Sequence, residues 1–599
     1  MLSNLAPRFY DTMTVYERYG IIIGVNIFFF VFFRTYAGII RHSSFIDAVR
    51  LLSATFSSLV VLIIFNYSYY FIAGKKIYLF PGLILSFVLS FTFLFCFRIV
   101  VKFLFENFIN STDAKQLTPT IVYGSDANAI AVANAIKSES PARFKIVGFM
   151  DNSKSNKSKS ILGLPILYSS KKTSVIMRSY RATALIIAEK SLSKEEKLAI
   201  IDDCLEHNIK VYTIPIITNW DNEKELSKQI KSFQIEDLLE RKPIVLDNKL
   251  VSSQLSNKTV LITGAAGSIG SEIVWQVLEF NPKKLIIIDQ AETPLHHISL
   301  EIEKAKQKVK VITIISDIRN KSSMDRVFEK HNPDVVFHAA AYKHVPLMEE
   351  NPCQAIYTNV LGTKNIADLS LQYGVKKFVM VSTDKAVNPS NVMGASKRIA
   401  EKYVQSLHYK NALENNPTTK FITTRFGNVL GSNGSVVPLF KKQIENGGPI
   451  TITHPEIIRY FMTIPEACQL VLEAGGMGNG GEIYIFDMGK PVKIIDLARK
   501  MIKLAGYEPD KEIEIKIVGL RPGEKLYEEL LNDTSKTLAT HHDKIMIAQE
   551  QEEECNGIIE AINELITISL HKEEVEIVQY MKKIVPEFKS LNSTYEILD

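Results

Sequence analysis

Three apolar runs without a charged side chain fill most of the N-terminal region: residues 20–33, 52–72 and 78–97. A bilayer core about 30 Å thick is crossed by a helix of about 20 apolar residues. The second and third runs reach this length, whereas the first is shorter and needs its flanks or a tilt. Because the apolar character covers every face of these segments, buried helices of a soluble core are the weaker interpretation. We therefore predict a transmembrane helical region over residues 1–110.

Basic residues beside these runs indicate the orientation of the spans. They are more numerous after the first and third runs than between the second and third: Arg34, Arg41 and Arg50, then Arg98 and Lys102, against Lys75 and Lys76. By the positive-inside rule, the loop 34–51 and the chain after residue 98 lie in the cytoplasm, so three spans place the N-terminus outside. No small-residue cleavage site follows the first run, so we do not expect a removed signal peptide.

After residue 110, hydrophobic runs of strand length alternate with helical patterns. The runs are residues 118–124, 144–151, 183–190 and 209–217. This alternation is typical of a parallel α/β domain. Its first turn contains Gly124 but lacks the glycine spacing that binds a pyrophosphate, so we predict a degenerate Rossmann-like domain over 111–245 with a structural or regulatory role. Residues 152–160 are interpreted as a solvated loop and residues 235–258 as a linker.

A second strand–turn–helix unit, over residues 259–280, has the glycine spacing that the first lacks. Its turn contains Gly264, Gly267, Ser268, Ile269 and Gly270. Glycines at this spacing permit a tight turn and the close approach of a dinucleotide pyrophosphate to the helix N-terminus. Asp289 ends the next strand, where a carboxylate accepts both ribose hydroxyls and repels a 2′-phosphate. NAD is therefore favoured over NADP, with Asp317 after the third strand facing the adenine edge.

Composition excludes few classes of protein. At 599 residues the chain is too long for one core, so we expect several domains. The 70 basic and 65 acidic residues give a net charge of only +5, which does not support nucleic-acid binding. The 5 cysteines lie far apart without metal-ligand spacing, so we predict reduced thiols and no metal site.

The chain also carries longer motifs: TGAAGSIGSE (263–272), HAAAYKHVPLMEENP (338–352), STDKAVNPSNVMGASKR (382–398), RFGNVLGS (425–432) and GLRPGEKLYEELL (519–531). In this order and spacing they strongly resemble the extended short-chain dehydrogenase/reductase superfamily. Within it, the chain is similar to the large membrane-bound nucleotide-sugar 4,6-dehydratases of bacterial polysaccharide and protein-glycan biosynthesis. The similarity covers almost the whole chain, including the membrane segment and the degenerate, CoA-binding-like first nucleotide fold. Such proteins usually begin with four spans, so whether a fourth helix is missing here stays open.

The resemblance implies an architecture and a setting. The fold is α/β, with N-terminal transmembrane helices, the degenerate domain, and a catalytic domain over 246–599 that ends in a small substrate-binding part. The protein is expected to be a homo-oligomer that spans the bacterial inner membrane several times, in contact with membrane lipid, with its catalytic domain in the cytoplasm. The implied substrate is UDP-N-acetylglucosamine, and the implied cofactor is NAD.

The family's chemistry defines what the site must do. NAD takes a hydride from C4 of the sugar, the resulting ketone acidifies the C5 proton, water leaves across C5 and C6, and the hydride returns to C6. The protein must therefore deprotonate O4, remove the C5 proton, protonate the leaving C6 hydroxyl and reprotonate C5.

The motif 382–398 supplies the catalytic residues. In most relatives a tyrosine and a lysine four residues apart handle O4, and here those positions are Met393 and Lys397. A thioether cannot take a proton, so the resemblance implies that Met393 marks a subfamily and that Lys397 binds the nicotinamide ribose. We assign Asp384 as the acid for the C6 hydroxyl, Lys385 as the base at C5 and Thr383 as the partner of O4. Burial and the charge of Lys397 are expected to lower the pKa of Lys385.

Further contacts follow from the other motifs. The remaining predicted cofactor contacts are Ile318, Ala339 and Ala340. The predicted substrate contacts are Lys343, Asn428, Arg459, Arg521 and Glu524. Arg521 is expected to bind the diphosphate, since a planar guanidinium can bridge two phosphate oxygens, and Glu524 to orient a ribose hydroxyl or the neighbouring arginine. His338 and His344 receive no role.

Two alternatives remain. A UDP-sugar epimerase or decarboxylase of the same fold would usually need the tyrosine and has no need of the pair Asp384–Lys385. A non-catalytic membrane sensor of nucleotide sugars need not keep these proton-carrying groups.

Overall fold

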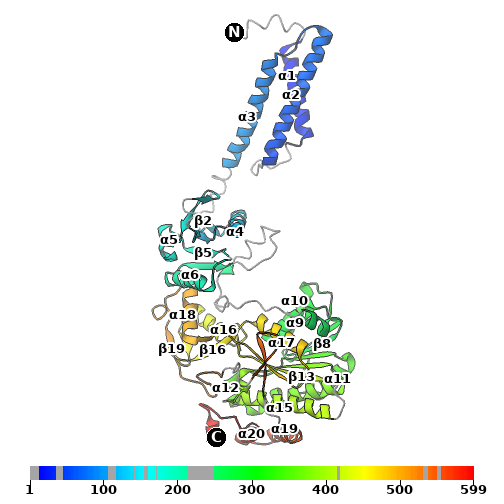
Figure 1. Cartoon of the computed structure of the whole chain (residues 1–599), viewed down its shortest axis with the longest axis vertical. Coiled ribbons are helices and arrows are strands. Elements are labelled where there is room, and N and C mark those ends of the chain that lie inside the picture. Colours follow the sequence, from blue (N-terminus) through cyan, green and yellow to red (C-terminus); the bar gives the residue numbers. More distant parts are fainter. Residues whose placement is uncertain are drawn as a thin grey trace. The chain divides into compact units, whose positions relative to one another are not determined.

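The computed structural model describes residues 13–35, 45–104, 117–139, 142–153, 159–169, 172–189, 191–213, 231–232, 248–413, 419–529, 537–549 and 555–599 (Figure 1). Within these residues the chain forms an apolar helical part and two separate large sheets.

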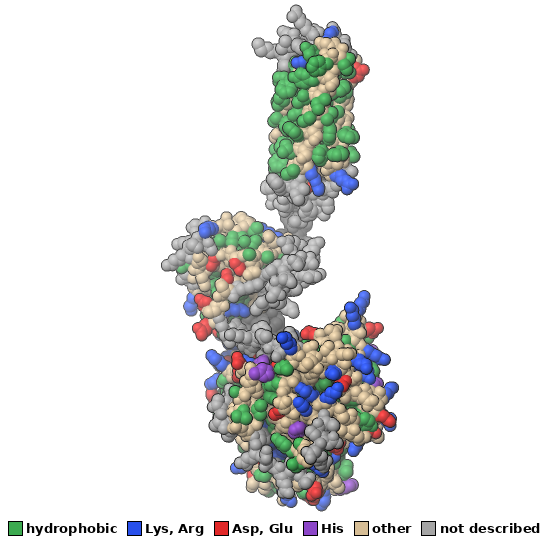
Figure 2. All heavy atoms as spheres, turned by 45° about the vertical axis from the view of Figure 1, so that its right-hand side comes forward, with side chains coloured by type: hydrophobic (Ala, Val, Ile, Leu, Met, Phe, Trp, Pro, Cys, Tyr) green, Lys and Arg blue, Asp and Glu red, His purple; other side chains and the backbone are tan. Residues whose placement is uncertain are grey.

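The predicted apolar runs are helices. They are α1 (Val15–Phe32), α2 (Phe45–Ala73) and α3 (Phe80–Leu104). Among the described residues these 3 helices are long and apolar enough to cross a membrane. Figure 2 shows hydrophobic side chains over the visible face of this part, with Lys and Arg near its ends. Phe93 is 73% exposed, so this helix is not buried among the described residues as a soluble core helix would be, which favours membrane association. The orientation of the spans stays a prediction.

The first sheet has 7 strands in the order β3-β4-β2-β1-β5-β6-β7. Its strands are β1 (Thr118–Tyr123), β2 (Phe144–Asp151), β3 (Ser160–Ile161), β4 (Leu164–Tyr168), β5 (Ala184–Ile187), β6 (Lys210–Thr213) and β7 (Lys231–Ser232). Its helices are α4 (Ala127–Ser138), α5 (Thr173–Ser179) and α6 (Lys194–Glu206). The pairs β1·β5, β5·β6 and β2·β4 are parallel, which confirms the predicted parallel α/β unit. The short strands β3, β4 and β7 were not predicted, and most of the predicted loop 152–160 lies outside the described residues.

The second sheet has 9 strands in the order β10-β9-β8-β11-β12-β13-β17-β21-β20. They are β8 (Thr259–Thr263), β9 (Lys284–Asp289), β10 (Lys310–Ile315), β11 (Val335–His338), β12 (Lys377–Val381), β13 (Lys420–Arg425), β17 (Ile483–Phe486), β20 (Thr537–Ala539) and β21 (Ile545–Ala548). All pairs from β10 to β17 are parallel, and β21 and β20 extend the edge antiparallel. This confirms the predicted Rossmann-type unit.

Helices cover both faces of this sheet (Figure 1). One face carries α8 (Asn248–Leu255), α9 (Ser268–Glu279), α10 (Glu292–Lys304) and α17 (Ile464–Met477). The other carries α11 (Lys321–His331), α14 (Thr363–Gln372) and α15 (Val392–Leu413), with α19 (Cys555–Ser569) and α20 (Glu574–Ile584) packed against α15. Side chains alternate along each strand, so Val260 packs on the first face and Leu261 on the second. Helix α8 falls within the predicted linker 235–258, and it is part of this core because Val251 and Leu255 are buried.

Shorter elements complete the domain. Between β11 and β12 lie α12 (Val345–Glu350), α13 (Pro352–Ala355) and the π-helix Ile356–Gly362. A small separate core is built from β15 (Ile450–Ile452), β16 (Ile458–Met462), β18 (Pro491–Lys493), β19 (Ile515–Ile517), α16 (Val436–Glu445) and α18 (Ile494–Leu504), and the short strand β14 (Asn428–Val429) pairs with β16. This core corresponds to the small C-terminal part expected from the sequence.

The strand order creates the place for a site. Strand β8 pairs with β9 on one side and β11 on the other, so the connections after β8 and β11 leave in opposite directions. In open parallel sheets, ligands bind in the crevice that opens at such a point, beyond the carboxyl ends of the strands.

A buried ion pair fixes α15 to β13. The Nε of Arg425 donates to Oε1 of Glu401 at 2.9 Å, and the exposed fractions of the two side chains are 4% and 0%. The Ser382 hydroxyl donates to the same carboxylate. The loop after β12 therefore depends on this carboxylate for its position.

We predict that Glu401→Ala lowers the free energy of unfolding by about 3–5 kcal/mol, because it removes the carboxylate that offsets a buried guanidinium. Urea unfolding of the full chain in mild detergent, followed by tryptophan fluorescence, measures the change. The matched control is Glu576→Ala, since Glu576 forms an exposed ion pair with Lys572, just before α20, and such pairs contribute about 1 kcal/mol or less. Equal losses in the two variants would contradict the prediction.

Candidate active site

The glycine-rich turn after β8 leaves no room for side chains at two of its positions. A Cβ at Gly264, whose φ is +68°, would lie 2.6 Å from the backbone nitrogen of Ala340. A Cβ at Gly270 would lie 2.0 Å from the carbonyl oxygen of Gly264. The turn therefore packs directly on the segment after β11, and its backbone lines a cradle at the start of α9.

A cavity of about 140 Å³ opens on one side of this turn, and it contains the residues predicted for the adenosine half of the cofactor. Among its lining residues are Asp289, Asp317, Ile318, Ala339 and Ala340. The Asp289 carboxylate accepts hydrogen bonds from the backbone N–H groups of Ala266 and Ala291, both at 3.0 Å, which hold it at the strand end.

Asp317 has a partner that the sequence analysis did not foresee. Its carboxylate lies 2.6 Å from a guanidinium nitrogen of Arg319. Burial alone would raise the pKa of Asp317, but the hydrogen bonds and charge of Arg319 outweigh it and lower that pKa. Arg319 is thus fixed at the same end of the crevice.

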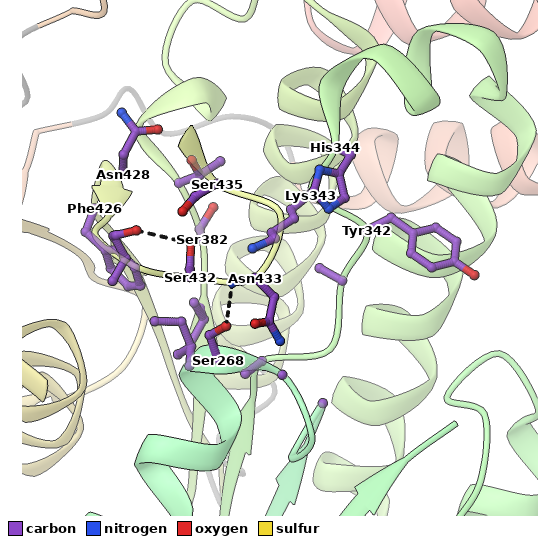
Figure 3. Close-up of a pocket in the computed structure, with 18 of the residues that line it drawn as sticks. Ser268, Tyr342, Lys343, His344, Ser382, Phe426, Asn428, Ser432, Asn433 and Ser435 are labelled. Carbon is purple, nitrogen blue, oxygen red and sulfur yellow. Dashed lines mark hydrogen bonds between the residues drawn. The ribbon is translucent and has the colours of Figure 1, made fainter. Parts of the chain in front are cut away.

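The main cavity, of about 480 Å³, lies on the other side of the turn (Figure 3). It brings together most of the predicted site residues: Gly264, Gly267, Ser268, Ile269, Gly270, Ala339, Lys343, Thr383, Lys385, Met393, Lys397 and Asn428. These come from the ends of β8, β11, β12 and β13 and from α15, because parallel strands present their carboxyl ends at one edge. The rim is closed where the N–H of Asn433 donates to the Ser268 hydroxyl at 3.0 Å.

Asp384 and Lys385 form a short turn directly after β12. The Lys385 ammonium lies 3.0 Å from Oδ1 of Asp384 and 3.5 Å from Oε1 of Glu528. Asp384 is only 6% exposed and lies behind the residues that line the cavity. The Thr383 hydroxyl donates to Oδ1 of Asp384 at 2.9 Å and accepts from the Lys385 N–H at 3.4 Å. The three predicted residues are therefore one hydrogen-bonded unit.

The predicted direction of the pKa shift of Lys385 is wrong. Burial does act to lower its pKa, but the carboxylates of Asp384 and Glu528 act more strongly together, and the pKa of Lys385 is raised. The lysine with a lowered pKa is Lys397, where burial brings the pKa to about 8. The Lys397 amine donates to the Val381 carbonyl at 2.7 Å and is held at the cavity wall.

Met393 lies on the same helix, one turn before Lys397. It is 3% exposed, packs into the core between sheet and helices, and lines the main cavity. The thioether thus fills space beside the lysine, as a packing role requires.

The motif after β11 gives three different environments. Lys343 extends toward the middle of the cavity, while the ring of Tyr342 points away from it (Figure 3). Burial lowers the pKa of Lys343. His344 also lines the cavity, although the sequence analysis gave it no role. His338 is fully buried between the hydroxyls of Thr263 and Thr363, at 2.8 and 2.9 Å, and burial lowers its pKa to about 3.

The predicted contacts of the C-terminal part differ from expectation. Arg459 lines neither of these cavities; its guanidinium is buried and donates to the carbonyls of Lys525 at 2.7 Å and Leu526 at 3.2 Å. Glu524 lies 3.6 Å from this guanidinium and accepts from the backbone N–H of Arg521. Arg521 itself is exposed. Arg459 therefore supports the segment that carries Arg521, and its predicted direct contact with substrate stays a prediction.

Sequence reasoning missed Glu528 and the serine-rich rim formed by Ser432, Asn433 and Ser435. Glu528 stands in the quoted motif 519–531, beside a second glutamate, and nothing local distinguishes the buried one from its exposed neighbour. The sequence carries no local signal for Glu528 because its contact with Lys385 joins residues that are far apart along the chain.

Comparison with known proteins identifies the family. The model of the family described as "Polysaccharide biosynthesis protein" matches residues 260–550, and that of a "CoA-binding domain" matches residues 33–215. The capsular polysaccharide biosynthesis protein CapD of Staphylococcus aureus is 50% identical over 358 residues, which are 60% of this chain and 59% of CapD. The match therefore spans less than two thirds of CapD.

Two further proteins extend the comparison. The X-ray structure of Pen from Bacillus thuringiensis has 34% sequence identity and a TM-score of 0.45, and the match covers 49% of this chain and 90% of Pen. The probable polysaccharide biosynthesis protein EpsC of Bacillus subtilis is 42% identical over 413 residues, 69% of this chain and 68% of EpsC. This identity over two thirds of EpsC means that the chain belongs to the polysaccharide biosynthesis protein family.

Proposed function

We propose that the chain is an NAD-dependent 4,6-dehydratase that converts UDP-N-acetylglucosamine into its 4-keto-6-deoxy derivative, UDP-2-acetamido-2,6-dideoxy-4-hexulose. One observation carries the proposal: Lys385 lines a cavity that the glycine turn also lines, and its amine stands 3.0 Å from the carboxylate of Asp384 directly behind that lining. An elimination of water needs an acid and a base side by side, whereas an epimerase needs neither of them in addition to its redox step.

The residues present fit NAD. Side chains are excluded where Gly264 and Gly270 pack against backbone, so the turn can approach a pyrophosphate closely. Asp289 would bind the adenosine ribose, Asp317 and Ile318 the adenine edge, and Lys397 the nicotinamide ribose. When bound, NAD would accept the C4 hydride and return it at C6. Ala339 and Ala340 line the cofactor cavity with small side chains that leave room for the cofactor.

The resting charges of the pair define the proton steps. With the raised pKa of Lys385, the pair rests as ammonium and carboxylate. Transfer of one proton from Nζ of Lys385 to Oδ1 of Asp384 gives an amine and a carboxylic acid without any change in total charge. Entry of the sugar excludes water, and a drier site favours this neutral form.

In the neutral form each group is ready for its task. The Lys385 amine takes the C5 proton, and Asp384 gives its proton to the C6 hydroxyl, which leaves as water. The Lys385 ammonium then returns a proton to C5 and is left as an amine beside the Asp384 carboxylate. Thr383 accepts the O4 proton through its hydroxyl and relays it toward Lys397, whose pKa of about 8 lets it both take up and release a proton near neutral pH. The released proton balances the one that the Lys385 amine takes up from solvent, which restores the ammonium–carboxylate pair.

The proposed substrate contacts come from the cavity wall and from the C-terminal part. Lys343 and Asn428 line the cavity and would contact the sugar nucleotide, while Arg521, supported by Arg459 and Glu524, would bind the diphosphate from the C-terminal part. The acetamido sugar itself is proposed on the motif resemblance.

We also propose the location and the domain organisation of the protein. Residues 1–110 would anchor the protein in the bacterial inner membrane among its lipids, 111–245 form the degenerate domain, and 246–599 form a cytoplasmic catalytic domain that associates as a homo-oligomer. No nucleic acid and no metal are needed.

Incubating the detergent-solubilised full chain with UDP-N-acetylglucosamine and no added NAD tests the proposal. The expected product is lighter than the substrate by one water. A product of unchanged mass with inverted C4 would establish an epimerase, and released NAD without any product would support a nucleotide-sugar sensor.

We predict that Lys385→Ala lowers kcat at least about 100-fold while the protein keeps its bound NAD, because the variant removes only the base at C5. Product formation by mass spectrometry and NAD released on denaturation measure the two effects. Normal turnover by this variant would refute the assignment, and loss of NAD along with activity would indicate a disturbed cradle instead.

We predict that Met393→Leu keeps the rate within about fivefold of the native enzyme, because leucine conserves the volume that the thioether fills. Steady-state kcat at saturating substrate decides the point. A loss comparable to that of Lys385→Ala would show that the sulfur itself takes part.

A further inference from the structure

Glu528 is a buried carboxylate that the mechanism above does not use. It is 8% exposed, and its Oε1 lies 3.5 Å from the Lys385 ammonium. The same oxygen lies 3.7 Å from Nε of Arg459. A buried carboxylate is costly unless cations offset it, and these two cations come from distant parts of the chain.

The position of Glu528 is fixed by its own partner. While Nε of Arg459 faces Glu528, its other guanidinium nitrogens donate to the carbonyls of Lys525 and Leu526. One guanidinium therefore holds both the carboxylate and the backbone that carries it. As a result, Glu528 faces Lys385 from a firmly supported segment.

The neighbouring Glu529 provides the contrast. It is exposed, and its carboxylate binds the Asn388 amide at 2.6 Å and the Lys525 ammonium at 3.1 Å. The two glutamates are adjacent and carry the same charge, but only Glu528 reaches the catalytic turn. This pair offers a matched control within one motif.

We propose that Glu528 is the positioning residue of Lys385: it holds the amine at the cavity beside Asp384 and keeps it charged until the sugar enters. The proposed role of Glu528 rests on the proposed dehydratase function, whereas the contact between Glu528 and Lys385 does not depend on it. Through Arg459, the segment that carries the predicted diphosphate contact Arg521 is thereby linked to the base.

The charges around Lys385 give the sign of the effect. Asp384 and Glu528 raise its pKa, while burial and Arg459 lower it. Removing the charge of Glu528 therefore lowers the pKa of Lys385, so the free amine forms at lower pH. The proposed mechanism needs the pair to hold one proton, so loss of that proton from Lys385 to solvent limits the rate at high pH, and the basic limb of the pH–rate profile moves to lower pH.

The experiment uses the full chain in detergent with E528Q, E528D and the control E529Q. Reductive methylation with isotope-labelled formaldehyde, quantified by mass spectrometry on the Lys385 peptide, reports the free amine without requiring activity. At pH 7, E528Q is expected to raise Lys385 labelling by roughly tenfold, with E528D and E529Q close to the native protein. In the dehydration assay, E528Q is expected to move the basic limb of kcat/KM to lower pH and to lower its plateau roughly tenfold.

Several outcomes decide the proposal. Unchanged labelling and an unmoved basic limb in E528Q overturn it, as does an equal effect of E529Q, which would indicate unspecific charge. A lower rate without a shift in either pH dependence also overturns it, because that is the result of a merely structural role. If E528Q fails to fold, E528D at native labelling supports the proposal and E528D with raised labelling contradicts it. If the native protein forms no dehydrated product, the proposed function fails while the labelling still decides the contact.

Discussion

The structure of this site depends on one constraint: a lysine ammonium that is largely buried, with 18% of its side chain exposed, must be offset by carboxylates. Lys385 meets Asp384 from its own turn and Glu528 from a segment far along the chain. Since burying an ion without partners costs several kcal/mol, the catalytic turn can take this position only when the C-terminal part is folded against it. The carboxylates of Asp384 and Glu528 that offset this ammonium also keep Lys385, the proposed base, charged at rest.

The rest of the site follows from the edge of a parallel sheet. Strands β8, β11, β12 and β13 all end at one edge, which places the glycine turn, the motif around Lys343 and the catalytic turn around a shared cavity. The glycine turn can lie against the segment after β11 only without side chains at Gly264 and Gly270. Backbone packing thus forms the dinucleotide side of the crevice, and ionised side chains form the sugar side.

Local patterns predicted the local features well. The strand that ends in Asp289, the turn with its three glycines and the turn Thr383–Lys385 are each encoded within a few neighbouring residues, and the structure has them where expected. The apolar helices are equally local, because bilayer-spanning length is written in one continuous segment. Such features need no knowledge of which distant segments meet.

Features that depend on distant contacts could not be predicted. The predicted pKa shift of Lys385 considered only burial and Lys397, whereas the carboxylates of Asp384 and the distant Glu528 together reverse its direction. Arginine is a common phosphate ligand, but two guanidinium nitrogens of Arg459 donate to the carbonyls of residues 525 and 526. The packing of α19 and α20 on α15 is likewise a property of the folded whole.

The most direct test of the central claim is to run the reaction in heavy water and to locate deuterium in the product by NMR. If an exchangeable amine removes and returns the C5 proton while the C4 hydride moves within the site, deuterium appears at C5 and the new C6 methyl group receives none through hydride return. Deuterium delivered to C6, or a product in which C5 keeps its original hydrogen throughout, would contradict the account.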